Sequence, residues 1–263
     1  MPLISIGDGA LYYESHGDQF PVLLIPGLGG TAASWRSQVE PFAQHFRVVL
    51  HDHRGTGRSE RSRITYSVDQ MAIDVVHLMD TLDIPQAHLV GISTGGAIAQ
   101  TLAVDHRDRI GRLVLVSTWP KADAFFRYTL GMRKHILEQL GPAAHLHTTP
   151  FFLYPDWWIN ENWEALEASM EAGLADFPGV EIMASRIDAI LAFDRASELG
   201  QIALPTLVLT AKNDILTPPY FAEDLAARIP GARLEIIERG AHACNQTVPE
   251  TFNDVVLRFL TAA

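Results

Sequence analysis

The sequence predicts an α/β protein: a mostly parallel sheet that helices cover on both faces. Short apolar runs alternate with segments of helical periodicity in the first 118 residues and again from residue 200 onward. Continuous apolar runs are typical of strands that are buried on both faces. Residues 119–199 contain helical segments and no strand-like run. We therefore expect a core domain of residues 1–118 and 200–263, with a helical cap of residues 119–199 inserted into it.

The expected elements follow one another along the chain in a regular order. The strand-like runs are Leu11–Ser15, Pro21–Ile25, Arg47–Asp52, Ala87–Val90, Arg112–Ser117, Pro205–Ala211 and Arg233–Glu238. The first of them precedes the alternation, so we expect it to be an antiparallel edge strand. Helices are expected at Trp35–Gln44, Val68–Leu82, Phe221–Arg228 and Pro249–Leu260, and directly after Ser93.

A serine between two glycines marks the junction of the fourth of these strands with the helix after it. The segment Gly91-Ile92-Ser93-Thr94-Gly95 has the G-x-S-x-G pattern of a nucleophile elbow. Such a turn is sharp, and small residues two positions on either side of the serine let it close. A serine at this position also reads as a plain helix cap. The strand before it and the helix after it favour a nucleophile.

A nucleophilic serine needs a base and a group that orients the base. His242 follows the last strand-like run, and Asp214 follows the run before it. Catalytic groups of parallel sheets gather at the carboxyl ends of the strands. The chain order Ser93, Asp214, His242 is the order of α/β-type serine hydrolases. These three residues are therefore our candidate catalytic triad.

The tetrahedral intermediate of such a reaction needs backbone donors for its oxyanion. One is the N–H of Thr94, directly after the nucleophile, and the other is expected from the loop after an early strand. In that loop, residues 25–30, Gly27 lets the backbone approach the substrate, and Leu28 supplies the second N–H. Our expected pocket walls beside Gly27 are Trp35, which is next to the oxyanion loop, and Trp119, which is at the exit of a strand.

Four other residues allow competing interpretations. Asp123 follows an earlier strand and is the alternative acid, while Asp214 also fits a simple turn. His51 and His53 flank Asp52 as a metal pair would, but no further ligands follow at a fitting spacing, so we expect them to orient a loop. Cys244 has no elbow around it and is expected to be a buried thiol.

Composition limits the partners. A net charge of −11 argues against nucleic acids and anionic membranes, which clustered Lys and Arg bind. No apolar run approaches the ~20 residues of a membrane span, and the first residues lack the features of a secretory signal. A single cysteine suits a reducing cytoplasm. We expect a cytoplasmic protein that acts on a small molecule without metal or cofactor, and a homodimer is left open.

The chain resembles the α/β-hydrolase superfamily along nearly its whole length. The segments that carry the resemblance are PGLGG, HDHRGTGRSE, GISTGG, AKNDILTPP and GAHACNQTVPETFN. The resemblance implies the α/β-hydrolase fold, with a mostly parallel eight-stranded sheet flanked by helices and a helical cap inserted after the strand that ends near Ser117. Within the superfamily, the chain looks most like the 3-oxoadipate enol-lactonases and the aminoacrylate hydrolases of pyrimidine breakdown. One departure is Gly240-Ala241-His242, where relatives usually have Gly-Gly-His.

The first functional hypothesis is a serine hydrolase that cleaves a small carboxylic ester or lactone through an acyl-enzyme on Ser93. An alternative keeps the same residues and cleaves a C–N bond, as in an aminoacrylate or a carbamate-like metabolite. A third, of another class, is a ligand sensor with this fold and little turnover. Fold alone does not choose among them.

Overall fold

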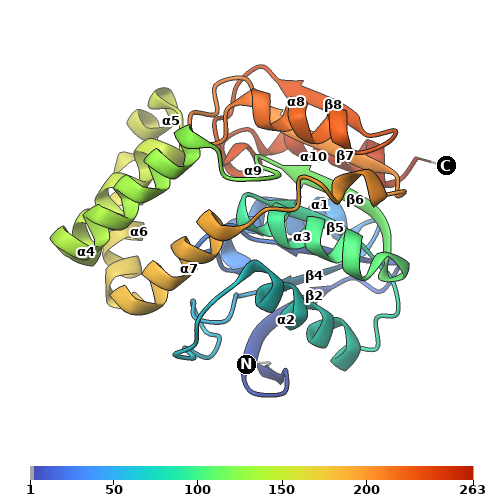
Figure 1. Cartoon of the computed structure of the whole chain (residues 1–263), viewed down its shortest axis with the longest axis horizontal. Coiled ribbons are helices and arrows are strands. Elements are labelled where there is room, and N and C mark those ends of the chain that lie inside the picture. Colours follow the sequence, from blue (N-terminus) through green and yellow to red (C-terminus); the bar gives the residue numbers. More distant parts are fainter. Residues whose placement is uncertain (1–2, 263) are drawn as a thin grey trace.

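The computed structural model describes residues 3–262, and an eight-stranded sheet forms the centre of the molecule (Figure 1). The strands lie in the order β1-β2-β4-β3-β5-β6-β7-β8. Their bounds are β1 Leu3–Ser5, β2 Ala10–His16, β3 Pro21–Ile25, β4 Arg47–His51, β5 Ala87–Ile92, β6 Ile110–Val116, β7 Thr206–Ala211 and β8 Arg233–Ile237. β1 and β2 are antiparallel to their neighbours, and β4, β3 and β5 to β8 pair in parallel. The predicted fold class is confirmed, and β1 is the strand that our expected elements lacked.

Alternate residues of the strands pack into two separate cores, one on each face of the sheet. On β6, Leu113 and Leu115 belong to one core, and Val114 and Val116 belong to the other. Because both faces are covered, the strand needs apolar residues at every position, which explains its continuous apolar run. The same reasoning holds for β3, β5 and β7.

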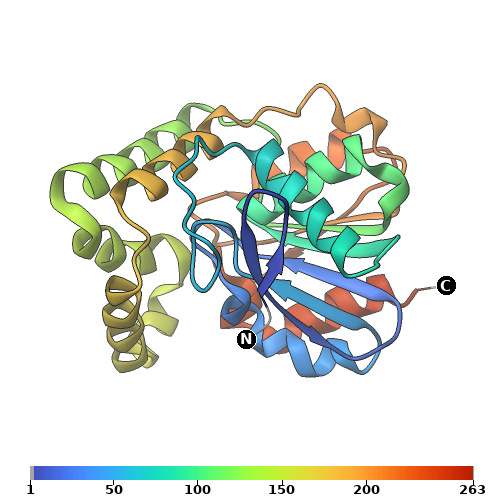
Figure 2. The same cartoon turned by 90° about the horizontal axis from the view of Figure 1, so that it is seen from below.

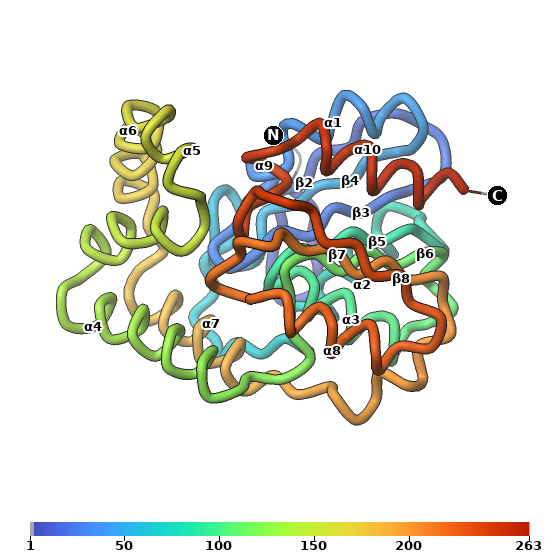
Figure 3. The backbone as a smooth tube through the Cα atoms, turned by 90° about the horizontal axis from the view of Figure 1, so that it is seen from above, coloured from blue at the N-terminus to red at the C-terminus, as the bar shows by residue number. Residues whose placement is uncertain are grey.

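Helices form a layer on each face. α2 Val68–Thr81, α3 Thr94–Asp105 and α8 Pro219–Arg228 contribute to one core. α1 Arg36–Ala43, α9 Cys244–Thr247 and α10 Pro249–Leu260 contribute to the other (Figures 1 and 3). The last helix has the predicted bounds, because Pro249 suits the first helical turn, where its missing N–H costs nothing.

Four helices lie between β6 and β7 in the chain and stand beyond the end of the sheet toward which the parallel strands point (Figure 2). They are α4 Ala124–Leu153, α5 Asp156–Glu161, α6 Trp163–Ala175 and α7 Val180–Ala192. α4 bends at Gly141, whose φ of 84° lies in the left-handed region that favours glycine. Across residues 3–262, each helix is too short or too polar to traverse a bilayer.

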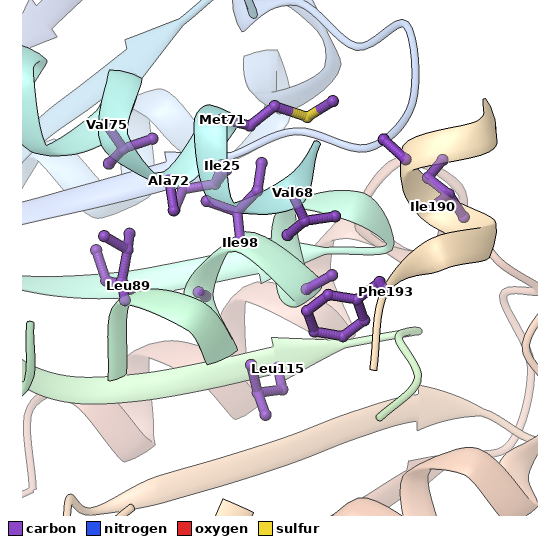
Figure 4. Packing of buried hydrophobic residues seen from close by; sticks show 14 of the residues in the cluster. Ile25, Val68, Met71, Ala72, Val75, Leu89, Ile98, Leu115, Ile190 and Phe193 are labelled. Atoms are coloured by element: carbon purple, nitrogen blue, oxygen red, sulfur yellow. The ribbon is translucent and has the colours of Figure 1, made fainter. Parts of the chain in front are cut away.

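The inserted helices share one core with the sheet. Ile190 of α7 and Phe193 belong to the same buried cluster as Ile98 of α3 and Leu115 of β6, and Figure 4 labels all four. All four side chains are buried, and each contributes roughly 1.5–3 kcal/mol to stability by leaving water. The insertion is therefore packed onto the sheet and covers the ends of its strands.

Candidate active site

Ser93 occupies a strained turn between β5 and α3. Its φ is 55° and its ψ is −119°, a conformation that residues with side chains rarely adopt. A side chain at Gly91 would overlap the backbone of Gly95, and one at Gly95 would overlap the carbonyl of Ile25. Both glycines are thus required for the close approach of strand, turn and helix. The turn leaves Ser93 half-buried and part of a cavity wall.

His242 and Asp214 form a buried hydrogen-bonded pair. The His242 Nδ1 lies 2.9 Å from the Asp214 Oδ2 and 3.1 Å from the Thr217 hydroxyl oxygen. Asp214 also accepts hydrogen bonds from the Thr217 hydroxyl at 2.8 Å and from the N–H groups of Leu216 and Thr217, both at 2.9 Å. These donors satisfy the carboxylate and hold it toward the imidazole. The Nε2 of His242 remains available for proton transfer.

Asn213 joins the two loops that carry this pair. Its side-chain oxygen accepts hydrogen bonds from the N–H groups of Gly240 and Ala241, at 3.0 and 2.9 Å. Gly240 and Ala241 have positive φ values of 144° and 54°, so the loop needs an external anchor to hold this course. Asn213 is a site residue that our sequence reasoning missed, although its place beside Asp214 was a signal.

The loop after β3 lies against Ser93. Residues 27–30 form a tight turn, in which the N–H of Gly30 donates to the Gly27 carbonyl at 3.0 Å. Gly29 has a φ of 65°, as the third position of such a turn requires. A side-chain carbon at Gly27 would lie 3.3 Å from the Ser93 Cβ, so the backbone of this loop borders the serine. Thr94, as the first residue of α3, has an N–H without a partner inside the helix.

His53 holds this loop from beneath. Its Nε2 donates to the carbonyl oxygen of Pro26 at 2.8 Å. Burial lowers the pKa of His53 well below its ordinary value, so the ring is neutral and its Nε2 carries the proton. Asp52 acts on the same segment and accepts the Ala32 N–H at 2.8 Å. The hydrogen bond from His53 to Pro26 therefore supports the expected loop-orienting role of the His51–His53 segment.

One cavity of about 560 Å³ lies between the sheet and the inserted helices. Ser93, His242, Gly27 and Leu28 all line it, so the structure brings the predicted nucleophile, base and oxyanion loop together. The cap closes its other side with Arg133, among other residues.

The expected pocket walls need a correction. Trp35 and Trp119 are both completely buried, and among the described residues neither lines the cavity. Trp35 packs against Phe252 in one core, and Trp119 packs against Phe126 in the other. We expected these walls from sequence position, which does not show that each indole points into a core.

Two alternative readings find other roles in the structure. Asp123 caps α4 by accepting the Phe126 N–H at 2.8 Å, and it accepts the Tyr220 hydroxyl at 2.7 Å. It is thus engaged away from His242. Cys244 is fully buried, as expected, and burial raises the pKa of its thiol to about 12.

A backbone hydrogen bond joins the inserted helices to the loop that carries His242. The N–H of Ala243, next to His242, donates to the carbonyl of Leu153 in the last turn of α4 at 2.9 Å. The Tyr154 hydroxyl adds a hydrogen bond of 3.2 Å to the side chain of Gln246. The end of α4 therefore supports the segment that positions His242.

Comparisons with known proteins agree with this architecture. A family model described as alpha/beta hydrolase fold matches residues 21–140. A protein of Azorhizobium caulinodans, provisionally named carbamate hydrolase RutD, is 42% identical over 259 residues, which cover 98% of both chains. The enol-lactonase from Burkholderia xenovorans LB400 aligns with a TM-score of 0.92 and 28% identity, over 99% of this chain and 100% of that one. A thermophilic esterase from Thermogutta terrifontis aligns with a TM-score of 0.86 and 25% identity, over 96% of this chain and 93% of that one.

Proposed function

The chain belongs to the α/β-hydrolase family, and we propose that it is a serine hydrolase that cleaves a C–N bond in a small metabolite of the carbamate or aminoacrylate type. The observation that carries the catalytic part is the shared cavity of Ser93 and the His242–Asp214 pair. The choice of a C–N bond is supported by the Azorhizobium relative, whose name refers to a carbamate. This choice reverses the order of the first two of our three sequence-based hypotheses.

In the proposed reaction with a carbamate, the Ser93 hydroxyl attacks the carbonyl carbon bonded to nitrogen. His242 takes the hydroxyl proton on Nε2, and Asp214 stabilises the resulting imidazolium through Nδ1. His242 then returns the proton to the departing nitrogen as the C–N bond breaks. A water, deprotonated by the same His242, releases the acyl group from Ser93 and restores the enzyme.

The oxyanion of each tetrahedral intermediate is stabilised by the N–H groups of Leu28 and Thr94. Such a donor is worth about 3 kcal/mol of barrier, provided that it points at the oxyanion before the reaction begins. The strained turn at Ser93 and the His53 contact to Pro26 both serve this preorganisation.

A second candidate is hydrolysis of a small ester or lactone. The resemblance to the enol-lactonase of Burkholderia xenovorans and to the esterase of Thermogutta terrifontis favours it. The residues and steps are the same, and the leaving atom is oxygen instead of nitrogen.

The test measures ammonia release from aminoacrylate and from acetamide, in which nitrogen is the single leaving atom, and nitrophenol release from p-nitrophenyl acetate, with the wild type and Ser93→Ala. We expect ammonia release that falls by about 10⁴-fold or more in Ser93→Ala. Ser37→Ala, an exposed serine of α1, is the matched control and keeps the full rate. Nitrophenol release without ammonia release would favour the ester candidate. A Ser93→Ala variant as fast as the wild type would refute both.

A further inference from the structure

A buried arginine of the cap reaches the active-site cavity. Arg133 lies on the first half of α4, and 5% of the residue is exposed. It lines the same cavity as Ser93 and His242. Its Nη2 donates to the Thr149 hydroxyl at 3.2 Å, while its buried Nε has no hydrogen-bond partner among residues 3–262. Guanidinium N–H groups are rarely left without acceptors in a protein interior.

Among residues 3–262, no carboxylate is paired with Arg133. Its guanidinium lies 5.3 Å from the centre of the Phe152 ring. Its carbonyl oxygen lies 3.3 Å from the Nδ1 of His145, whose pKa is lowered to about 4 by burial and by Arg133. Burial lowers the pKa of Arg133 to about 10, and the side chain therefore remains charged at neutral pH. The cation is held in the wall by neutral groups.

Two other buried arginines show that the place of Arg133 in the cavity wall, and not its lack of a carboxylate alone, sets it apart. Arg186 also has no carboxylate partner, and its buried Nε and Nη2 have no hydrogen-bond partner among residues 3–262. Arg54 forms two hydrogen bonds with Asp74, at 3.0 and 2.7 Å, and one with Asp8 at 2.8 Å. Arg186 donates to the Arg54 carbonyl and lies over the Tyr66 ring, between α7 and the sheet domain. Neither is among the described residues that line the cavity.

The acidic side chain at the cavity is already engaged. Among the described lining residues, Asp176 is the single carboxylate, and it is paired with Arg61 at the exposed rim. A carboxylate that entered the cavity would thus meet an uncompensated guanidinium and little negative charge. Planar carboxylates match guanidinium geometry, and such hydrogen bonds are stronger than neutral ones.

We propose that Arg133 binds a carboxylate of the substrate and selects small anionic molecules whose reacting carbon lies at Ser93. This inference rests on the proposed function, because Ser93 defines the reacting end. It adds a second recognition point, supplied by the cap instead of the sheet domain. Neutral esters and carbamates of the same size would lack this interaction.

The test uses the monomethyl and dimethyl esters of malonate, succinate, glutarate and adipate, whose hydrolysis is followed by acid release. Each pair differs by one carboxylate charge, and the series varies the distance between carboxylate and ester. We expect the wild type to prefer the monoester at one or more lengths. Arg133→Met should lower that preference roughly 10- to 100-fold, chiefly through KM, because a charge-assisted hydrogen bond is lost. An unchanged preference at every length, or a wild type that prefers every diester, would overturn the proposal.

Two variants separate binding from structure. Arg127→Met removes an exposed charge from the same helix and should keep the monoester preference. Arg133→Lys keeps a charge without the planar fork and should restore part of it. If Arg133→Met does not fold, Arg133→Lys and Arg133→Gln carry the comparison.

Calorimetric titration of Ser93→Ala with monomethyl succinate and monomethyl glutarate gives a readout without turnover. We expect binding that weakens roughly 10- to 100-fold when Arg133→Met is added. An enzyme that hydrolyses nothing, yet binds these ligands through Arg133, would contradict the proposed function alone. Binding or hydrolysis that ignores Arg133 would contradict the present inference alone.

Discussion

Asp214 and Arg54 of the sheet domain and Arg133 of the cap are buried charged groups held in opposite ways. In the sheet domain, Asp214 accepts four hydrogen bonds and Arg54 is paired with two carboxylates. In the cap, Arg133 has a single hydroxyl acceptor. A group that must act in every turnover gains from being held in place. A group that must recognise a ligand gains from hydrogen-bond donors that have no acceptor within the protein. The two regions thus divide the work between chemistry and selection.

The largest expected effect comes from changing Asp214, the firmly held group of the sheet domain. In Asp214→Asn, the amide still fits between Thr217 and the backbone donors, but it cannot stabilise the imidazolium of His242. We expect kcat to fall by about 10³- to 10⁴-fold, with little change in KM and in thermal stability. Steady-state kinetics and a melting curve check this. A loss below tenfold would mean that another group orients His242.

The next effect compares two arginines directly. Arg54→Met leaves Asp74 buried without its cation, and we expect a loss of about 3–5 kcal/mol in the free energy of unfolding. Arg133→Met removes a buried charge that has no counterion, and we expect a gain of about 1 kcal/mol or more. Urea denaturation of both variants measures the two values. If Arg133→Met were destabilised as strongly as Arg54→Met, Arg133 would belong with the structural arginines.

Low pH affects both regions, because each contains a buried neutral histidine. Burial lowers the pKa values of His51 in the sheet domain and His145 in the cap to about 4. Between pH 6.5 and 4 the unfolded chain binds protons that the folded chain excludes, so stability is full above pH 6.5 and falls as pH decreases. Each histidine contributes about 1.4 kcal/mol per pH unit in this window. His51→Phe should remove one such contribution from the slope of unfolding free energy against pH, and an unaltered slope would contradict it.

The smallest effect concerns strain in the loop before His242. Ala241 has a φ of 54°, where an alanine costs roughly 1 kcal/mol relative to glycine. We expect Ala241→Gly to raise the melting temperature by a few degrees, with catalysis unchanged, because Asn213 still anchors the loop. Calorimetry resolves a shift of this size. A lowered melting temperature would show that the Ala241 methyl packs favourably.

The sheet and the candidate triad could be predicted because local signals and chain order agree there. Ser93, Asp214 and His242 each follow a strand-like run, and parallel strands bring their carboxyl ends together. β1 was missed because three residues carry no usable alternation. Trp35 and Trp119 were misplaced because sequence does not say which side of a turn faces a cavity. Arg133 could not be found, since its distinction is a place in the cavity wall without a paired carboxylate, which only the folded chain displays.

The hydrogen bond from Ala243 to Leu153 also bears on how this protein could be re-engineered. A cap transplanted from a relative would bring its own final turn of α4, and with it a new acceptor position beneath the His242 loop. Exchanging the cap as a module would therefore alter catalysis along with selectivity. Changes confined to the first half of α4, before the bend at Gly141, leave that acceptor in place. This half of the helix is the natural target for directed evolution of new substrates.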